Sequence, residues 1–287
     1  MLQWICRFSG LAIVCCWVCP ALALAALSVD APAEAPQGSA VLIRLSGAEA
    51  REVTVHWQDR TFSVPLAEDQ GRYSGLALLP MPLDDARPLA LRVTDGKVSA
   101  TVEIRPRKVN WPRQEIQVAG KYVSPTPEAQ KRIEAEQRKV RAVLARNEPE
   151  RWWETPCIRP VPGEVSSVFG GQRVFNGQPR SRHRGVDLRG PEGQPVLAVT
   201  GGRVAIAEEH YFSGKVVFID HGLGLVSLYA HLSALLVAEG DMVKAGQEIG
   251  LVGATGRATG PHLHWGVNIL GKPVDPLSLL SLGANNF

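Results

Sequence analysis

The sequence predicts a mainly β protein with two β regions joined by a linker that contains one helix. Three observations predict this class. Short runs of alternating apolar and polar residues fill the first third of the chain, one helical segment follows, and apolar runs punctuated by glycine fill the rest. With 45% hydrophobic and 21% charged residues over 287 positions, the chain has an ordinary globular composition and the length for two modest domains.

Residues 1–25 predict an export signal. Arg7 gives the start a positive charge, residues 11–18 form an apolar run that Pro20 interrupts, and residues 23–25 (Ala-Leu-Ala) fit a small-x-small cleavage site. A retained membrane anchor is the alternative, although the run is short for a span. We therefore expect an exported protein, in the periplasm or outside the cell, with no stable membrane span after cleavage.

Cysteine use agrees with export. Four of the five cysteines lie within the predicted signal, so the mature chain keeps only Cys157 and is expected to fold without an internal disulfide. The formal net charge of +3 is too small to indicate a nucleic-acid partner.

Residues 26–107 predict a small β-sandwich of immunoglobulin-like type. About seven short strands separated by turn material fit two packed sheets. No catalytic set is visible there, and His56 is expected to be a half-buried strand residue. The region would serve as a spacer, a binding module or an inhibitory cap. The clearest strands are expected at residues 40–45, 52–57, 60–65, 89–93 and 100–104.

Residues 108–156 predict a linker with one surface helix. Thr126 is the expected N-cap with Pro127 in the first turn, and the helix should run to about Arg146. Its thin apolar stripe, among many Lys, Arg and Glu residues, is typical of a helix that lies on one surface. Trp152 and Trp153 are expected to close the linker against the next domain.

Residues 157–287 predict a second, antiparallel β domain. Gly163 to Gly283 contains 21 of the 28 glycines, and so many turn-permissive residues between short apolar runs favour tightly turning sheet. Residues 220–224 fit a hairpin turn, and no helix of useful length is evident. Strands are expected at residues 196–199, 202–206, 215–219, 225–229 and 248–252.

Five residues of this domain carry the chemistry. His183 and Asp187 lie four positions apart, His231 ends an apolar run, and His262 and His264 alternate in an expected strand. Alternate strand residues leave the same face, so His262 and His264 point together and either could bind a metal. A catalytic zinc takes three such ligands and leaves a position for water, while the remaining imidazoles can move protons.

Three segments around these residues resemble the M23 zinc peptidases of the lysostaphin or LytM type. They are residues 183–187 (His-Arg-Gly-Val-Asp), 227–233 (Ser-Leu-Tyr-Ala-His-Leu-Ser) and 260–265 (Gly-Pro-His-Leu-His-Trp). Residues 220–222 and 243–247 extend the likeness, which covers about residues 160–277. The N-terminal sandwich and the linker also look like those that precede the M23 domain in secreted members of Gram-negative type.

The resemblance implies an M23 (LytM) type domain and a role for each residue. His183, Asp187 and His264 would bind one Zn²⁺ per chain, and His231 and His262 would act on the water, the proton and the developing oxyanion. The implied activity is a zinc metalloendopeptidase that hydrolyses peptide bonds in peptidoglycan stem peptides or cross-links. Peptidoglycan is then the expected partner, and a contact by which the N-terminal domain inhibits its own groove is left open.

Two other functions fit parts of the sequence. A catalytically silent M23-like protein could bind cell wall or activate a separate amidase, but such members lose ligands or histidines that are all present here. Residues 241–247 look like those of lipoyl or biotinyl carriers, yet Lys244 precedes a strand instead of occupying a hairpin tip. Arg173 and Asn176 either line the substrate groove or support a loop.

Overall fold

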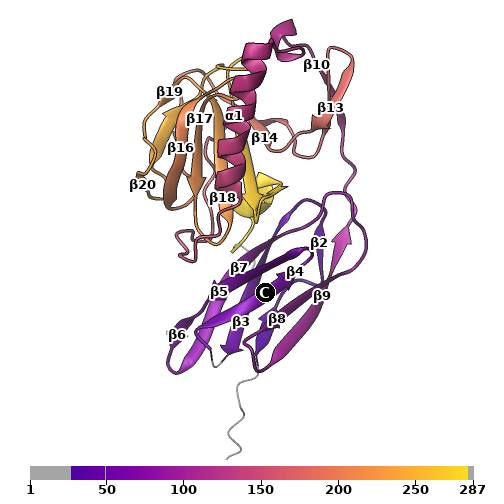
Figure 1. Cartoon of the computed structure of the whole chain (residues 1–287), viewed down its shortest axis with the longest axis vertical. Coiled ribbons are helices and arrows are strands. Elements are labelled where there is room, and N and C mark those ends of the chain that lie inside the picture. The colour runs from indigo at the N-terminus through magenta and orange to yellow at the C-terminus, as the bar shows by residue number, and fades with distance from the viewer. Residues whose placement is uncertain (1–26, 49, 284–287) are drawn as a thin grey trace, which may run out of the picture.

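The structure, a computed structural model, describes residues 27–48 and 50–283, so the predicted export signal lies outside the described residues. Figure 1 shows an N-terminal pair of β-sheets below and a second β region above, with one long helix lying across the upper sheet. The mainly β fold class is therefore confirmed. Within the described ranges, no helix combines the length and the apolar character that crossing a bilayer requires.

The N-terminal region is a β-sandwich of two sheets. Val53, Val55 and Trp57 are buried at alternate positions of one strand, which is the pattern of a sheet with one face in the core. One sheet has the order β1 (Ser28–Asp30), β3 (Ala40–Ala48), β7 (Arg72–Pro80), β6 (Ala67–Asp69). The other has the order β2 (Glu34–Pro36), β9 (Ser99–Arg107), β8 (Leu89–Thr94), β4 (Glu52–Trp57), β5 (Arg60–Pro65).

The five clearest strands are where the sequence predicts them, but the sandwich has more strands than expected. Among the described residues it contains nine, against about seven predicted. The longest strand outside the five clearest is β7, which pairs with β3 from Tyr73 to Pro80. Its last four residues are buried at successive positions, so this half of the strand lacks the alternation from which strands are recognised.

Helix α1 (Pro127–Leu144) begins as predicted. The Thr126 hydroxyl accepts a hydrogen bond from the backbone nitrogen of Ala129 at 3.2 Å, which caps the first turn. Only Ile133 and Val143 are buried on the helix. Val143 packs on residues of β16 (Gly202–His210), β17 (Gly214–Asp220) and β18 (Leu225–Leu232), including Phe218, so the thin apolar stripe faces the sheet. Figure 1 shows the helix lying across these strands.

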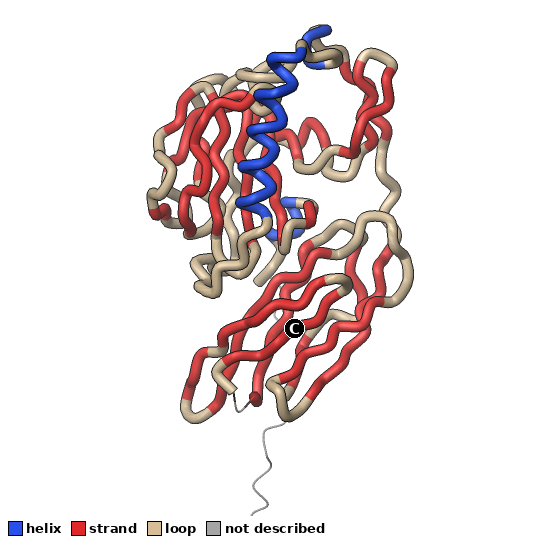
Figure 2. Tube along the Cα trace, in the orientation of Figure 1, coloured by secondary structure: helices blue, strands red, loops and turns tan. Residues whose placement is uncertain are grey.

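The C-terminal region is built on one large sheet, and its strands pair antiparallel as predicted. The sheet order is β11 (Val165–Ser167), β14 (Val186–Arg189), β22 (His262–Ile269), β18 (Leu225–Leu232), β17 (Gly214–Asp220), β16 (Gly202–His210), β20 (Met242–Val243), with β23 (Lys272–Val274) also paired to β22. A smaller sheet contains β15 (Pro195–Leu197), β21 (Glu248–Leu251) and β19 (Ala234–Leu235). The short helix α2 (Pro276–Leu280) follows, and the strands and helices are separated by colour in Figure 2.

One strand of the linker joins the C-terminal region. β10 (Arg113–Ile116) pairs parallel with β12 (Gln172–Phe175), which in turn pairs antiparallel with β13 (Gln178–Arg182). A short 3-10 helix (Gly120–Tyr122) follows β10 before α1. The sequence Arg-Gln-Glu-Ile has no apolar alternation, so only the backbone pairing with β12 marks it as a strand.

The sandwich and the C-terminal region are in direct contact. The backbone nitrogen of Asp275 donates to the Gly38 carbonyl at 2.7 Å, and that of Ala40 donates to the Ser278 hydroxyl at 2.9 Å. Buried residues of both regions belong to one continuous apolar cluster. Trp153 is buried in this cluster, in agreement with its expected place at the end of the linker.

Candidate metal centre and active site

Strands β14 and β22 bring the predicted ligands together. In their antiparallel register Asp187 lies opposite His264, and Arg189 lies opposite His262. Leu263 and Trp265 are fully buried on the other face of β22. The alternation that predicts co-facing histidines in this strand therefore holds, because the apolar residues between them occupy the core.

Three donor atoms converge on one point. His183 Nε2 lies 3.1 Å from His264 Nδ1 and 3.1 Å from Asp187 Oδ1, and the last two atoms are 2.8 Å apart. Zn²⁺ bonds of about 2.0–2.1 Å in tetrahedral geometry put ligand atoms about 3.3 Å apart. Two imidazoles and one carboxylate at these separations fit a zinc site.

The surroundings of these ligands fix the atoms that face the centre. His183 Nδ1 lies 2.9 Å from the Val168 carbonyl, which leaves Nε2 directed at the other ligands. Asp187 Oδ2 accepts a hydrogen bond from Arg173, which leaves Oδ1. Such partners hold the orientation and the tautomer of a metal ligand.

The protonation states also suit a cation. Burial lowers the pKa of His183 to about 4, so this imidazole is neutral near pH 7. Burial acts to raise the pKa of Asp187, but the neighbouring imidazoles of His183 and His264 outweigh it and hold that pKa far below its usual range. A neutral imidazole and an ionised carboxylate are the forms that bind zinc.

Gly185, between the first two ligands, is required by close packing. A Cβ at this position would lie 2.8 Å from Cε1 of the His264 ring and would also collide with the Trp265 carbonyl. Any larger residue would push β14 away from β22 and separate the ligand atoms.

His231 and His262 form a second pair beside the three ligands. Their ring centroids are 4.8 Å apart, and His262 Nε2 lies 3.9 Å from Asp187 Oδ1. His231 Nδ1 donates to the Thr255 carbonyl at 2.8 Å, and His262 Nδ1 donates to the Gly260 carbonyl at 2.9 Å. Both rings therefore keep Nε2 as the nitrogen that can receive a proton.

The backbone of His231 is unusual for a residue with a side chain. Its φ is 65°, in the left-handed region that favours glycine. Non-glycine residues in this region cluster at functional sites, where the strain fixes a side-chain direction. Burial lowers the pKa of His231 to about 3, so the ring is neutral near pH 7.

Other polar residues considered from the sequence divide into two groups. Arg173 reaches the site through Asp187, whereas Asn176 hydrogen-bonds the backbone of Val118 through both side-chain atoms and supports a loop. His221 has both ring nitrogens bonded inside the core, and His210 pairs with Glu208. The structure does not bring the last two histidines to the ligands.

Gln114 is a site residue that the sequence does not reveal. Its Oε1 accepts a hydrogen bond from the Ser167 hydroxyl at 2.7 Å, and it lines a pocket of about 330 Å³ together with Asp187 and His262. This wall of the site comes from the linker strand β10. Nothing in the local sequence marks it, because its position depends on pairing with a strand about 60 residues later.

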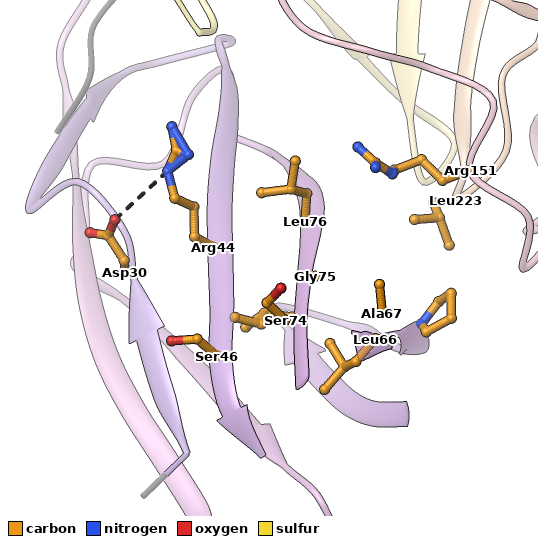
Figure 3. Close-up of a pocket in the computed structure, with 12 residues that line it drawn as sticks. Asp30, Arg44, Ser46, Leu66, Ala67, Ser74, Gly75, Leu76, Arg151 and Leu223 are labelled. Carbon is orange, nitrogen blue, oxygen red and sulfur yellow. Dashed lines mark ion pairs between the residues drawn. The ribbon is translucent and has the colours of Figure 1, made fainter. Parts of the chain in front are cut away.

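A separate hollow of about 680 Å³ lies between the sandwich and the C-terminal region. Figure 3 shows Arg151 and Leu223 of the C-terminal side facing sandwich strands that carry Leu76 and Arg44. Its lining contains one ion pair, Arg44 with Asp30 at 3.9 Å, and none of the histidines. The hollow therefore lacks the imidazoles that the proposed chemistry needs, whereas the histidine cluster contains them.

The comparisons with known proteins match the part of the chain that contains the candidate site. The model of peptidase family M23 matches residues 181–276, which contain all five predicted site residues. A crystal structure from Pseudomonas aeruginosa, assigned to peptidase M23, aligns with a TM-score of 0.66 at 30% identity, over 85% of this chain and 94% of that chain. The chain belongs to peptidase family M23. An alignment of this extent includes residues on the N-terminal side of the M23 domain.

Two curated relatives match the M23 domain. DD-carboxypeptidase/endopeptidase Mpg of Neisseria meningitidis is 46% identical over 97 residues, which make up 34% of this chain and 22% of that protein. Peptidoglycan DD-endopeptidase ShyA of Vibrio cholerae is 40% identical over 114 residues, 39% of this chain and 26% of that protein. The alignments span about a quarter of the length of these relatives.

Proposed function

We propose that this M23 protein is a zinc-dependent endopeptidase that hydrolyses peptide bonds in peptidoglycan stem peptides or cross-links. The observation that carries the proposal is the convergence of three ligand atoms within about 3 Å of one another, beside two histidines that each keep one nitrogen for proton transfer. Relatives named as peptidoglycan DD-endopeptidases support the substrate class.

His183, Asp187 and His264 would hold the zinc ion. When bound, zinc lowers the pKa of a water molecule and polarises a carbonyl oxygen. Asp187 would contribute through Oδ1, since Arg173 occupies Oδ2. Two neutral ligands and one carboxylate leave the site with a net charge of about +1, which preserves the acidifying effect.

His231 and His262 would move the protons. Hydrolysis adds water to the scissile carbonyl, breaks the C–N bond and delivers one proton to the leaving amine. Nε2 of one ring takes the proton from water and passes it to the leaving amine, and the other ring, when protonated at Nε2 as well, donates a hydrogen bond to the oxyanion. The Thr255 and Gly260 carbonyls keep the proton of each neutral ring on Nδ1, so that Nε2 is the nitrogen that accepts a proton.

The remaining organisation of the chain belongs to the same proposal. An export signal at residues 1–25 would deliver the protein to the periplasm or beyond, where peptidoglycan lies. Residues 26–107 would form a sandwich domain and residues 108–156 a linker whose strand β10 borders the groove of the peptidase domain at residues 157–287. A contact of the N-terminal sandwich domain with this groove would keep the groove closed until substrate binds.

The test is cleavage of purified peptidoglycan by the exported form of the chain, followed by chromatography of the released muropeptides. We expect release that stops when zinc is chelated and returns when zinc is restored. The His264→Ala variant, folded by circular dichroism, should release nothing at any zinc concentration. Zinc binding without release from any peptidoglycan, or release that survives chelation, would reject the proposal.

A further inference from the structure

Two loops hold His231 in place. The backbone nitrogen of His231 donates to the Ser213 carbonyl at 2.8 Å, and its Nδ1 donates to the Thr255 carbonyl at 2.8 Å. Its φ of 65° is unfavourable for a residue with a side chain, so this conformation persists only where the surroundings enforce it. The direction of the ring therefore depends on the two loops that carry these carbonyls, residues 211–214 and residues 254–257.

The two loops interlock. The backbone nitrogen of Arg257 donates to the Phe212 carbonyl at 2.8 Å. Gly256 has a φ of 71°, and a Cβ on this residue would collide with the backbone of Gly214. A Cβ on Gly214 would in turn collide with the backbone of Thr255. Because the chains cross this closely, a shift of one loop moves the other.

A tyrosine of the linker closes the crossing from outside. The Tyr122 hydroxyl donates to the Gly256 carbonyl at 2.6 Å. Its ring makes an edge contact with Tyr211 at 5.5 Å between centroids, and the Tyr211 hydroxyl donates back to the Lys121 carbonyl at 2.9 Å. Tyr122 ends the short 3-10 helix that lies between β10 and α1, at the top of Figure 1. One linker residue thus contacts both loops.

The hydrogen bond from Tyr122 acts next to the carbonyl that holds His231. The carbonyls of Thr255 and Gly256 flank the α-carbon of Gly256, and rotation about a glycine is restricted less than about any other residue. A half-buried carbonyl that loses its partner also loses the free energy that kept it in place. By fixing the Gly256 carbonyl, the Tyr122 hydroxyl restricts the rotation that would turn the Thr255 carbonyl away from His231.

We propose that Tyr122 is a positioning residue for His231. Its hydroxyl holds the 254–257 loop where the Thr255 carbonyl keeps a proton on Nδ1 of His231, which leaves Nε2 as the nitrogen that accepts a proton. The inference rests on the proposed endopeptidase function and adds a residue that acts on the same site from a distance. Tyr122 lies outside residues 181–276, which match the family model. The linker would therefore complete a site that the peptidase domain carries.

The position of Tyr122 separates this role from substrate binding. The described residues that line the pockets of about 330 Å³ and 400 Å³ beside the site histidines do not include Tyr122. Loss of its hydroxyl should therefore lower kcat and leave KM unchanged. Zinc affinity should also stay unchanged, because the hydroxyl acts on the loop of His231, which is not one of the three converging ligands.

The sandwich offers a matched control. The Tyr73 hydroxyl of strand β7 donates to the Glu68 carboxylate at 3.1 Å on the protein surface. Tyr73→Phe removes the same group, with the same loss of one hydrogen bond, from a region that carries none of the site residues. This variant should keep the kcat, the KM and the zinc affinity of the wild type.

The first experiment measures kcat, KM and zinc affinity with a soluble cross-linked muropeptide dimer as substrate. Tyr122→Phe keeps the ring and its contact with Tyr211, so it should fold, as circular dichroism checks. We expect its kcat to fall about 5- to 30-fold, as for the loss of a hydrogen bond to a half-buried carbonyl. Wild-type kcat in folded Tyr122→Phe, an equal loss in Tyr73→Phe, or a change confined to KM or zinc affinity would overturn the inference.

A spectroscopic measurement separates failure of the positioning role from failure of the proposed function. Nitrogen NMR of the zinc-loaded protein with isotope-labelled histidine shows which ring nitrogen carries the proton and needs no cleavage. The signals of His231 are assigned by their loss in His231→Gln. They should show a proton on Nδ1 in the wild type and in Tyr73→Phe, and a mixture of both tautomers in Tyr122→Phe.

The two readouts have distinct outcomes. A changed tautomer in Tyr122→Phe, in a protein whose wild type cuts no peptidoglycan, would support the positioning role while the proposed function fails. Unchanged His231 signals in Tyr122→Phe would overturn the positioning role even where the wild type is an active peptidase.

Discussion

Two histidines lie near opposite ends of strand β18, and their rings differ in the number of nitrogens bonded inside the protein. His221, just before the strand, is fully buried and bonds the Gly201 carbonyl at 2.6 Å and the Ser227 hydroxyl at 2.7 Å. The ring of His231, near the other end, has one hydrogen bond within the described residues, to the Thr255 carbonyl. A histidine with both nitrogens bonded in the core supports the fold, whereas one that keeps a nitrogen beside metal ligands can do chemistry.

The largest expected effect comes from removing a ligand. His264→Ala should abolish both zinc binding and cleavage, because only His183 and Asp187 would remain of the three converging donors. Zinc content by mass spectrometry and muropeptide release measure the two effects. Full zinc occupancy in this variant would show that the metal is held elsewhere.

The second prediction compares the two ends of β18 directly. His231→Ala should keep zinc and lower kcat by about 10²- to 10⁴-fold, the contribution of a positioned acid or base. His221→Ala should lower the free energy of unfolding by about 1–3 kcal/mol, since a buried carbonyl loses its partner, and should keep kcat per folded molecule. Zinc content, kcat and urea unfolding of both variants provide the measurement.

The comparison fails if the two variants behave alike. Retained activity in His231→Ala would remove its catalytic role. A loss of kcat in folded His221→Ala equal to that in His231→Ala would show that a histidine bonded at both nitrogens can still control the reaction.

A smaller effect is expected from the residue that orients Asp187. Arg173→Met should weaken zinc affinity about 10- to 100-fold, the usual cost of losing a partner of a metal ligand. Competition with a zinc chelator measures the affinity. Arg189→Met, which removes an exposed arginine from β14, the strand that carries Asp187, is the control and should match the wild type. Equal affinities in all three proteins would contradict a positioning role for Arg173.

The smallest effect concerns Cys157, the free cysteine of the described residues. Burial raises the pKa of its thiol to about 12, so almost no thiolate exists near pH 7. A maleimide reagent should leave the native protein without residues 1–25 unmodified and should label it once in denaturant, as read by mass spectrometry. Rapid labelling of the native protein would mean that this part of the linker junction opens easily.

Much of the fold could be predicted because its strands follow simple patterns. Strand β4 matches the expected residues because Val53, Val55 and Trp57 alternate with polar positions. Strand β10 could not be found, since it depends on a partner far along the chain. The second half of β7 is buried on successive residues and so loses the periodic pattern.

The sequence predicts which residues form the site, but it does not predict how their side chains are arranged. Alternation in β22 predicts that His262 and His264 face the same side, which the structure confirms, yet it cannot choose between them as ligands. The family resemblance made that choice, and it stays a prediction. The contact of Arg173 with Asp187 and the left-handed backbone of His231 arise from tertiary packing and leave no local pattern.

Anomalous diffraction at the zinc absorption edge tests the central claim most directly. Crystals of the protein grown with one equivalent of zinc should show a single strong peak within bonding distance of His183 Nε2, Asp187 Oδ1 and His264 Nδ1, with Nε2 of His231 facing it. A peak at other residues, or none at this cluster with zinc in excess, would contradict the account of this chain as a zinc peptidase.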